Sequence, residues 1–332
     1  MSLTLPPLLY LSAADVRRAL PMPDAIAAMR EAFLQLSCGR VVLPPRVRID
    51  AACDNGVALF MPCYVHEGNL LGLKLVTLFE RNPQRGLPLV QALVIVADGT
   101  TGMPLAVMDG ASLTALRTGA ASGVATDCLA REDAEVAAVF GGGVQGRTQL
   151  EAVCCVRHIR HARVYDADAT AGERFAAEMT ERLGLPVQRA ADPAQALEDA
   201  AVVCTATTSS RAVFQDHELP PGVHINAVGS YKPDVSEIPC ETVCRARIVV
   251  DHRASALEEA GDLLLPLRQG RIRKEQVHAE LGEVLAGRAP GRSSAGEITL
   301  FKSVGVAIQD LFAAARAAAN ARTLHLGIDL PR

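Results

Sequence analysis

The segment that decides the fold is Phe140-Gly141-Gly142-Gly143-Val144-Gln145-Gly146, which directly follows the apolar run 135–139. Its glycines have the spacing G-x-G-x-x-G. In such a loop the first glycine makes a tight turn, the second lets the backbone approach a phosphate, and the third lets the following helix pack on the strand. The N-terminus of that helix offers unpaired N–H groups to the anion. The pattern therefore predicts a strand, a pyrophosphate-binding loop and a helix in the middle of the chain.

An acidic residue stands where a dinucleotide-binding fold needs one. Asp166 ends the next apolar segment, 162–165, and lies 20 residues beyond Gly146. A carboxylate at this place accepts the hydroxyl groups of the ribose and repels a 2′-phosphate. The loop and the acid together favour a nicotinamide dinucleotide site over an ordinary glycine-rich turn with a helix-capping Asp. Because the nearest downstream arginine is Arg174, NAD(H) is favoured over NADP(H).

Strands and helices alternate from residue 135 onward, which is the pattern of a doubly wound parallel sheet. We expect strands at 135–140, 162–165, 201–205, 223–228 and 247–250, and helices at 144–157 and 169–184. The fold class of this part is therefore α/β. The alternating pattern predicts a Rossmann-type domain that binds the cofactor and extends over residues 121–305.

The first part of the chain has a different pattern. A capping box at Ser12-Ala13-Ala14-Asp15 opens a short helix, and apolar residues at helical spacing follow from Ile26 to Leu36. Strand-like segments then occur at 57–61, 71–78, 89–97 and 104–108, with a hairpin at 98–102. Strands without intervening helices indicate an antiparallel sheet. We therefore predict an α+β domain over 1–120, a bridging helix at 111–130, and a final helix at 303–321, with residues 306–332 packed back on the first domain.

The bulk composition excludes several classes of protein. The 332 residues are 49% hydrophobic and 21% charged, with a net charge of −4, as in ordinary globular chains with room for two domains. Without a basic excess, nothing indicates binding to nucleic acid or to an anionic membrane. The longest apolar run, 92–97, is far too short to cross a membrane.

The cysteines and the first residues point to a reducing compartment. The nine cysteines are an odd number and have neither C-x-x-C nor zinc-ligand spacing, so we expect free thiols and no metal. Residues 1–7 lack the basic start and long apolar stretch of a signal peptide. The sequence therefore predicts a cytoplasmic protein.

The nicotinamide end of a cofactor lies beyond the carboxyl ends of the later strands of such a domain. Two of these strands end in small and hydroxylated residues that permit close approach. The residues that we expect to contact the cofactor there are Thr205, Ala206, Thr207, Val228 and Gly229. Ser303 is expected to contact it too and to be the N-cap of the final helix. The alternative is that these segments are routine turns at strand ends.

Three cations in the first domain stand in unusual places. Lys74 lies inside an otherwise apolar strand, Arg117 lies in an apolar helical stretch, and Arg46 follows two prolines. Each one alone fits a surface charge or a structural ion pair. Together they suit a small carboxylate, because each charge-assisted hydrogen bond contributes roughly 1.5–3 kcal/mol. Lys74 can also donate a proton, provided that burial or cationic neighbours lower its pKa.

The residues resemble the ornithine cyclodeaminase/mu-crystallin family over nearly the whole chain. The matching stretches are Pro44-Pro45-Arg46, Gly72-Leu73-Lys74, Gly86-Leu87-Pro88, Leu113-Thr114-Ala115-Leu116-Arg117-Thr118, Gly141 to Gln145, Val228-Gly229 and Leu300-Phe301-Lys302-Ser303-Val304-Gly305. The resemblance implies a homodimer built through the first domain and a cleft for a small imino or amino acid. It places Arg46, Lys74 and Arg117 at the substrate carboxylate. It places Thr118, Gln145 and Asp166 at the cofactor, beside the loop residues Gly141, Gly143 and Val144.

One residue departs from the pattern of the ornithine cyclodeaminases themselves. They carry an Asp two residues after the glycine that corresponds to Gly229, where this chain has Tyr231; Asp234 lies three residues further, past a proline. Without that carboxylate for an ammonium substrate, the chain looks closer to the branch that reduces cyclic ketimines such as Δ1-pyrroline-2-carboxylate, and to mu-crystallin. The resemblance then implies hydride transfer to the C=N carbon of a small ketimine acid, giving an L-amino acid. Tyr231 is a candidate hydrogen-bond donor or a packing residue at a turn.

Two other functions stay open at this point. One is an ornithine or lysine cyclodeaminase, or an amination catalyst like alanine dehydrogenase. The other is a binding protein that keeps the sites for cofactor and ligand without turnover, as in the non-enzymatic uses of mu-crystallin. The three cations together argue against the second of these.

Overall fold

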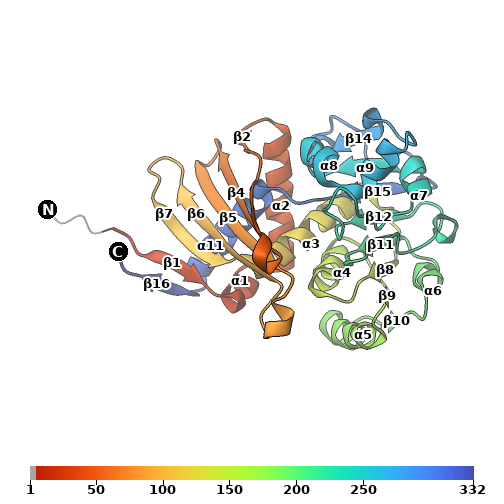
Figure 1. Cartoon of the computed structure of the whole chain (residues 1–332), viewed down its shortest axis with the longest axis horizontal. Coiled ribbons are helices and arrows are strands. Elements are labelled where there is room, and N and C mark those ends of the chain that lie inside the picture. Colours follow the sequence, from red (N-terminus) through yellow and green to blue (C-terminus); the bar gives the residue numbers. More distant parts are fainter. Residues whose placement is uncertain (1–4) are drawn as a thin grey trace. The chain divides into compact units, whose positions relative to one another are not determined.

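The computed structural model describes residues 5–332, and the chain divides into two compact units (Figure 1). The first unit comprises the residues up to Arg117 together with Val306–Arg332, and the second comprises Thr118–Gly305. The sequence places this boundary at 120 and again at 305. Residues 1–4, on which the expectation about a signal peptide partly rests, lie outside the described residues.

The first unit is built on a mixed sheet with the strand order β16-β1-β7-β6-β5-β4-β2, and β3 pairs with β4. From β7 through β4 the neighbours are antiparallel, as predicted, whereas β1 and β7 are parallel. The strands are β1 Leu8–Leu11, β2 Val41–Val42, β3 Val47–Ala51, β4 Gly56–Val65, β5 Leu70–Phe79, β6 Val90–Asp98, β7 Pro104–Asp109 and β16 Ile328–Leu330. The sequence misses β1, β2, β3 and β16, because they are short and do not alternate clearly between apolar and polar residues.

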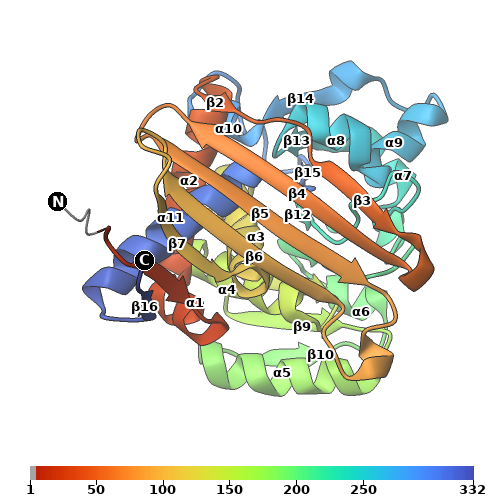
Figure 2. The ribbon, with the colours of Figure 1, turned by 60° about the vertical axis from the view of Figure 1, so that its left-hand side comes forward.

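Helices α1 (Ala13–Ala19), α2 (Met22–Ser37) and α11 (Ala307–Thr323) belong to this unit, and Figure 2 shows α2 and α11 behind the sheet. Ser12 and Asp15 form the predicted capping box. The final helix packs against β4, β5 and β6. Gly72 of β5 permits this contact, since a Cβ there would lie 2.6 Å from Leu311 of α11. Helix α11 therefore lies directly against the middle of β5.

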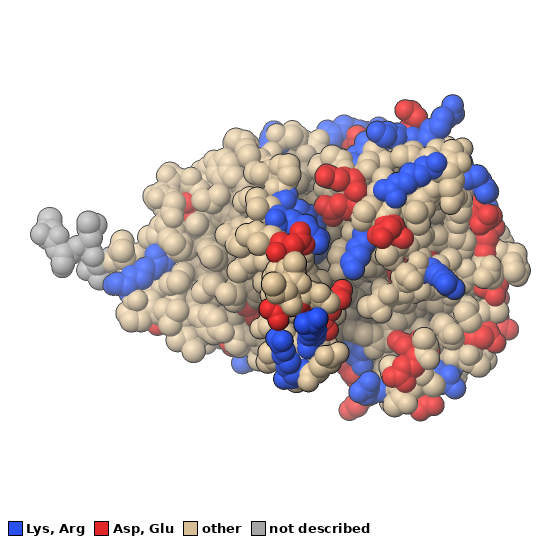
Figure 3. Space-filling model, viewed as in Figure 1, with Lys and Arg blue, Asp and Glu red and all other residues tan. Residues whose placement is uncertain are grey.

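The face of this sheet away from α11 is apolar and exposed. On β5 and β6 the outward side chains of Leu71, Leu93 and Ile95 are 39%, 46% and 38% exposed. In Figure 3 few charged side chains lie over β5–β7. A contiguous apolar surface of this kind marks an interaction site in soluble proteins.

The second unit contains an eight-stranded sheet with the order β10-β9-β8-β11-β12-β15-β13-β14, and every pairing in it is parallel. The strands are β8 Val136–Phe140, β9 His161–Tyr165, β10 Val187–Arg189, β11 Val202–Thr205, β12 His224–Ala227, β13 Arg247–Val250, β14 Val277–Glu280 and β15 Thr299–Lys302. From the β8–β11 pair the chain adds β9 and β10 on one side of the sheet and β12 to β15 on the other. Doubly wound folds bind ligands at this switch point, and the predicted Rossmann-type sheet is confirmed.

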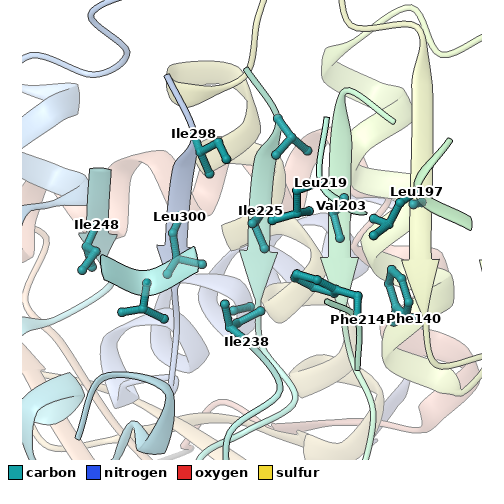
Figure 4. Packing of buried hydrophobic residues seen from close by; sticks show 14 of the residues in the cluster. Phe140, Leu197, Val203, Phe214, Leu219, Ile225, Ile238, Ile248, Ile298 and Leu300 are labelled. Atoms are coloured by element: carbon teal, nitrogen blue, oxygen red, sulfur yellow. The ribbon is translucent and has the colours of Figure 1, made fainter. Parts of the chain in front are cut away.

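Helices cover this sheet, and α3 (Gly110–Leu129) runs from the first unit into the second. The others are α4 Val144–Val156, α5 Ala169–Leu183, α6 Pro193–Leu197, α7 Cys240–Arg245, α8 Arg253–Glu259, α9 Gly261–Arg268 and α10 Leu281–Leu285, with short 3-10 helices at Ala52–Asp54, Pro83–Arg85, Asp216–Glu218 and Lys274–Gln276 along the chain. Alternate residues of these strands pack into two different apolar clusters, one on each face of the sheet. Phe140 and Val203 belong to one (Figure 4), and Val139 and Val202 to the other. Burial on both faces explains why these strands are continuous apolar runs.

Several features bear on the predicted class of protein. Within residues 5–332 no helix has the length and apolar character needed to cross a membrane. The same part of the chain has no group of three His, Cys, Asp or Glu residues arranged to hold a metal ion. All nine cysteines are free thiols.

Candidate active site

Lys74, Arg117 and Asp310 form a buried cluster of charges in the first unit. Nζ of Lys74 lies 2.5 Å from Oδ2 of Asp310, and Nε of Arg117 donates to Oδ1 of Asp310 at 2.9 Å. The three residues are 3%, 6% and 1% exposed. Because two cations share one carboxylate, these three residues carry a net positive charge. Such a cluster attracts a further carboxylate, which is the group expected on the substrate.

Three elements bring the cluster together. Lys74 lies two residues after Gly72 in β5, so its side chain is on the face that α11 covers. Arg117 lies in α3, and Nη1 of its guanidinium donates to Oε1 of Gln309 at 2.8 Å. Gln309 and Asp310 are neighbours on α11. The final helix therefore supplies both acceptors that orient Arg117.

The surroundings of Lys74 make it a better acid than an ordinary lysine. Its pKa is lowered from 10.5 to about 8, mainly by burial and also by the positive charges of Arg117 and Arg46, while Asp310 opposes the shift. Arg46, which directly precedes β3, is thus electrostatically coupled to the other two predicted cations. Burial by itself raises the pKa of Asp310, but Arg117 and Lys74 together hold it below its usual value. Asp310 therefore stays ionised and Lys74 is an ammonium at neutral pH.

Asp310 and Gln309 were not among the residues expected from the sequence. One signal could have identified Asp310: it is an acid inside the apolar stretch 306–314, just as Lys74 is a base inside an apolar strand. A buried lysine needs a partner of opposite charge, so a search for a buried acid would have reached this helix. Gln309 is uncharged, so nothing in the sequence marked it in the same way.

The glycine loop has the conformation that its pattern predicts. Gly141 has a φ of +100°, and a Cβ there would lie 2.5 Å from the carbonyl oxygen of Ala206. A Cβ at Gly146 would lie 2.1 Å from the carbonyl oxygen of Gly141. By contrast, a Cβ at Gly143 would have nothing within 4 Å. The loop is therefore tight at its first and third glycines and open at the second, where a phosphate is expected.

The N-terminus of α4 is open in the same way. Gly143 is its N-cap, and no side chain caps the first turn. Val144 is 67% exposed, and the buried Oε1 of Gln145 has no hydrogen-bond partner within residues 5–332. Uncapped N–H groups at a helix N-terminus fit an anionic ligand. These residues therefore fit the pyrophosphate of a dinucleotide.

Thr118 lies on α3 where that helix contacts α4. Its carbonyl oxygen accepts a hydrogen bond from Nε2 of Gln149 at 3.2 Å. At the next residue, Gly119, a Cβ would lie 2.4 Å from the carbonyl oxygen of Thr148. The two helices are therefore in close contact at Thr118, and the contact of Thr118 with the cofactor stays a prediction.

Asp166 directly follows β9 and contacts the glycine loop. Its Oδ2 accepts a hydrogen bond from the backbone N–H of Gly142 at 2.6 Å. On the other side of the loop, Arg147 donates to the carbonyl oxygens of Gly142 and Gly143 at 2.5 and 3.0 Å, and it pairs with Glu178 at 2.8 Å. The acid is thus fixed where the ribose is expected. The nearby arginine is engaged by the loop and by Glu178.

The ends of β11 and β12 are joined by a buried carboxylate that the sequence did not single out. Oε1 of Glu237 accepts from N and Oγ1 of Thr207 at 2.7 and 2.6 Å. Oε2 accepts from Oγ1 of Thr205 at 3.2 Å and from N of Ser230 at 3.0 Å. Two of the residues expected at the cofactor, Thr205 and Thr207, are therefore held by Glu237.

The other expected residues at this edge are held by backbone hydrogen bonds. The N–H of Ala206 donates to the carbonyl oxygen of Phe140 at 2.9 Å. The N–H groups of Val228 and Gly229 both donate to the carbonyl oxygen of Thr205, at 3.0 and 3.2 Å. These residues extend the ladders from β8 through β11 to β12, so they lie together at the carboxyl ends of the strands.

Gly229 and Tyr231 differ in their surroundings. A Cβ at Gly229 would lie 2.2 Å from Oε2 of Glu237, so the glycine makes room for that carboxylate. Tyr231 is 41% exposed. Its side chain is thus available to a ligand, although contacts of either residue with a cofactor or substrate stay predictions.

The prediction that Ser303 caps the final helix is wrong. Helix α11 begins at Ala307 and its N-cap is Val306. Oγ of Ser303 instead donates to Oδ2 of Asp251 at 2.7 Å, and that oxygen also accepts from the N–H of Gly305 at 2.7 Å. Asp251 is distant in sequence, so a local pattern could not show that it binds the hydroxyl. The expected contact of Ser303 with the cofactor stays a prediction.

The chain is similar to known proteins over nearly its whole length. The model of the ornithine cyclodeaminase/mu-crystallin family matches residues 8–323. A Δ1-pyrroline-2-carboxylate reductase of Bacillus cereus is 38% identical over 308 residues, which are 92% of this chain and 94% of the relative.

Two solved structures have the same fold over nearly the whole chain. The Δ1-pyrroline-2-carboxylate reductase of Thermococcus litoralis, in complex with NADH and L-proline, has a TM-score of 0.93 and 40% identity and covers 97% of this chain and 100% of its own. An archaeal alanine dehydrogenase dimer with bound NAD has a TM-score of 0.90 and 36% identity and covers 97% and 98%. The chain therefore belongs to the ornithine cyclodeaminase/mu-crystallin family.

Proposed function

We propose that this chain reduces the C=N bond of a small ketimine acid with a nicotinamide cofactor and releases an L-amino acid. The observation that carries the proposal is the buried Lys74–Arg117–Asp310 cluster, which has a net positive charge and a lysine of lowered pKa. The similarity to two Δ1-pyrroline-2-carboxylate reductases supports a cyclic substrate such as Δ1-pyrroline-2-carboxylate. A linear imine remains the second choice of substrate.

Each cation of the first unit has a role in this proposal. Arg117 and Arg46 bind the substrate carboxylate, since a guanidinium presents a planar fork to it. Lys74 orients the substrate and donates a proton to the imine nitrogen, because an ammonium of pKa about 8 is an effective acid near neutrality. Tyr231 is an additional hydrogen-bond donor to the substrate. The bound cofactor supplies the hydride.

The second unit holds the cofactor in this proposal. The backbone of Gly141, Gly143, Val144 and Gln145 binds the pyrophosphate at the start of α4, and Asp166 binds the ribose hydroxyls. The residues proposed to contact the remaining, nicotinamide-bearing half are Thr118, Thr205, Ala206, Thr207, Val228, Gly229 and Ser303.

Oxidation of NADH across a panel of imines tests the function. The panel comprises Δ1-pyrroline-2-carboxylate, Δ1-piperideine-2-carboxylate, and pyruvate or oxaloacetate with ammonia or methylamine. We expect the highest kcat/KM with a cyclic ketimine. Pyruvate with ammonia tests the second candidate, a dehydrogenase of linear amino acids, which the archaeal alanine dehydrogenase favours. Release of ammonia from ornithine with NAD, or tight binding of NADH without any turnover, would contradict the proposal.

We expect kcat/KM to be higher with NADH than with NADPH. Asp166 is fixed at the loop by Gly142, so a 2′-phosphate there meets a negative charge. Replacing Asp166 with Ser removes that charge, so the kcat/KM values with NADH and with NADPH should become more similar. Asp192→Ser is a suitable control, because Asp192 caps α6 by accepting from Gln195 and should leave the ratio unchanged. A strong preference of the wild type for NADPH would refute the assignment.

We also propose that two copies of the chain associate through the apolar sheet face of the first unit, in line with the dimeric alanine dehydrogenase. Replacing Leu93 with Glu, in the middle of this face, should convert the dimer into a monomer, because a buried carboxylate without a partner is costly. Sedimentation or light scattering measures the mass. Leu324→Glu, at the end of α11 and 54% exposed, should stay dimeric. A Leu93→Glu variant that remains a dimer would exclude this face.

The free cysteines favour a cytoplasmic location. Sγ of Cys240 and Sγ of Cys244 lie 4.0 Å apart and are not joined. Unpaired neighbouring thiols persist in a reducing compartment. We therefore propose that the enzyme works in the cytoplasm.

A further inference from the structure

A second buried cluster of charges lies at the carboxyl ends of the strands in the second unit. Lys302 is the last residue of β15, Asp262 lies in the first turn of α9, and Glu237 follows the end of β12. All three are fully buried. Nζ of Lys302 lies 2.7 Å from Oδ2 of Asp262, and Oδ1 of Asp262 accepts from the N–H of Glu237 at 2.7 Å. The three residues form one connected network, and the proposed reaction assigns no role to it.

Every polar atom of Ser230 has a hydrogen-bond partner, and two of its three partners belong to this network. Its N–H donates to Oε2 of Glu237 at 3.0 Å, and its carbonyl oxygen accepts from Nζ of Lys302 at 2.5 Å. Its hydroxyl donates to the carbonyl oxygen of Val235 at 2.5 Å. The backbone at Ser230 therefore has one conformation, and the chain leads directly from it to the exposed Tyr231.

Glu237 uses its full capacity as an acceptor. An ionised carboxylate has about four acceptor positions. Those of Glu237 are filled by Thr207 twice, by Thr205 and by Ser230. Thr205 is the last residue of β11, and Thr207 and Ser230 lie in the loops after β11 and β12. Buried groups with this many donors hold their partners in one geometry, provided that every member is satisfied.

The placement of the network is what distinguishes it from an ordinary structural ion pair. It joins the loops after β11 and β12 at the edge where a doubly wound sheet binds its ligand. Arg292 offers a contrast at the other end of β15: it donates to the carbonyl oxygen of Leu129 at 2.8 Å and to Oγ1 of Thr299 at 3.0 Å, and it also donates to carbonyl oxygens of residues 294, 295 and 297.

We propose that Glu237 is a positioning residue for the cofactor, held in turn by Asp262 and Lys302. It keeps the loop after β11 and the loop after β12 at one fixed separation before the cofactor binds, so that ordering them costs little at binding. This inference rests on the proposed assignment of these two loops to the nicotinamide half of the cofactor.

Replacement of Glu237 with Gln tests the proposal. One carboxylate oxygen becomes an NH₂ group that faces the N–H of either Thr207 or Ser230, so at least one loop loses its acceptor. We expect the Kd for NADH to rise about 10–100-fold, the range that corresponds to a lost charge-assisted hydrogen bond. The fluorescence of bound NADH reports the Kd directly, and the chain contains no Trp whose emission would interfere.

Arg292→Met is the matched control, because it removes part-buried hydrogen bonds near Thr299, at the opposite end of β15 from Lys302. We expect it to lower the Tm and to leave the Kd for NADH unchanged. If Glu237→Gln lowers the Tm as Arg292→Met does but leaves the Kd within about twofold of wild type, the role of Glu237 is structural only and the proposal fails. Glu237→Asp, which keeps the charge, should recover part of the affinity.

A measurement on the wild-type protein covers the case in which Glu237→Gln does not fold. The N–H groups of Thr207 and Ser230 should exchange slowly with solvent before NADH is added, because Glu237 already holds them. Fast exchange that becomes slow only with NADH would overturn the proposal. The two proposals fail separately: wild-type protein that binds NADH but reduces no imine contradicts the function, whereas the role of Glu237 is judged from binding and exchange.

Discussion

Replacing Asp310 with Asn is expected to abolish most of the imine reduction and to destabilise the protein. The carboxylate of Asp310 pairs with both Lys74 and Arg117, and all three residues are buried. Asn keeps the size of the side chain but removes the charge. Breaking a buried ion pair from one side costs about 3–5 kcal/mol, because the remaining charge stays buried without compensation.

The effect on catalysis comes from geometry and from charge together. Without Asp310, Nε of Arg117 loses its acceptor, and only Gln309 still orients the guanidinium. A misplaced carboxylate-binding group costs about 10²-fold in rate when the substrate shifts by about 1 Å. The pKa of Lys74 should fall below 8 as well, since Asp310 is the group that opposes its downward shift.

Urea denaturation and steady-state kinetics measure the two effects. Asp50→Asn is the control: Asp50 pairs with Arg48 at 2.6 Å, but both side chains are exposed, so stability and activity should hardly change. The Kd for NADH of Asp310→Asn should stay near that of the wild type, which separates the loss of activity from unfolding. An Asp310→Asn variant with wild-type kcat/KM would show that the cluster does not bind the substrate.

The glycine loop could be predicted from the sequence because its constraints are local. Gly141 needs a left-handed conformation, and Gly146 contacts a residue only five positions earlier. Short-range requirements of this kind leave a fixed spacing in the sequence. The same applies to Ser12 and Asp15, whose capping box lies within a single turn.

The residues that hold the two sites together could not be found in this way. Asp310 reaches Lys74 and Arg117 across more than 190 positions of the chain, and Lys302 reaches Ser230 across 72. No spacing rule connects such pairs, since the fold alone brings them together. The sequence does show that Lys74 lies in an apolar strand. Because a buried charge without a partner is costly, a partner of opposite charge can be predicted even though its position cannot.

Ser303 and Gly229 show how a local pattern can give a wrong or incomplete explanation of why a residue occurs at its position. A serine shortly before an apolar helix is typical of an N-cap, but Asp251 accepts its hydroxyl and the helix begins four residues later. Gly229 at a strand end suggested close approach of a cofactor, whereas the carboxylate of Glu237 occupies the space of its missing Cβ. In both cases a buried acid from elsewhere in the chain decides the geometry.

Replacing Lys74 with Met should lower kcat/KM for the imine by about 10²–10⁴-fold, the contribution typical of a positioned acid. The variant keeps the length of the side chain and loses the charge, and NADH should still bind because the dinucleotide loop is in the other unit. Activity within tenfold of the wild type, with NADH bound, would show that Lys74 is not the proton donor.

The pH dependence of the wild type is the sharper test of the same role. Reduction requires the ammonium form of Lys74, and its pKa is about 8, so the competent fraction of the free enzyme falls as the pH rises through 8. The value of kcat/KM should then decrease about tenfold per pH unit above that point. Because the imine itself titrates, the profile must be compared with that of Lys74→Arg, whose guanidinium stays protonated throughout. Lys74→Arg should have a lower kcat/KM than the wild type, but its kcat/KM should no longer fall near pH 8. In Asp310→Asn the fall in kcat/KM should begin at a lower pH. A fall at the same pH in all three proteins would come from titration of the substrate, and in that case the proton comes from another donor.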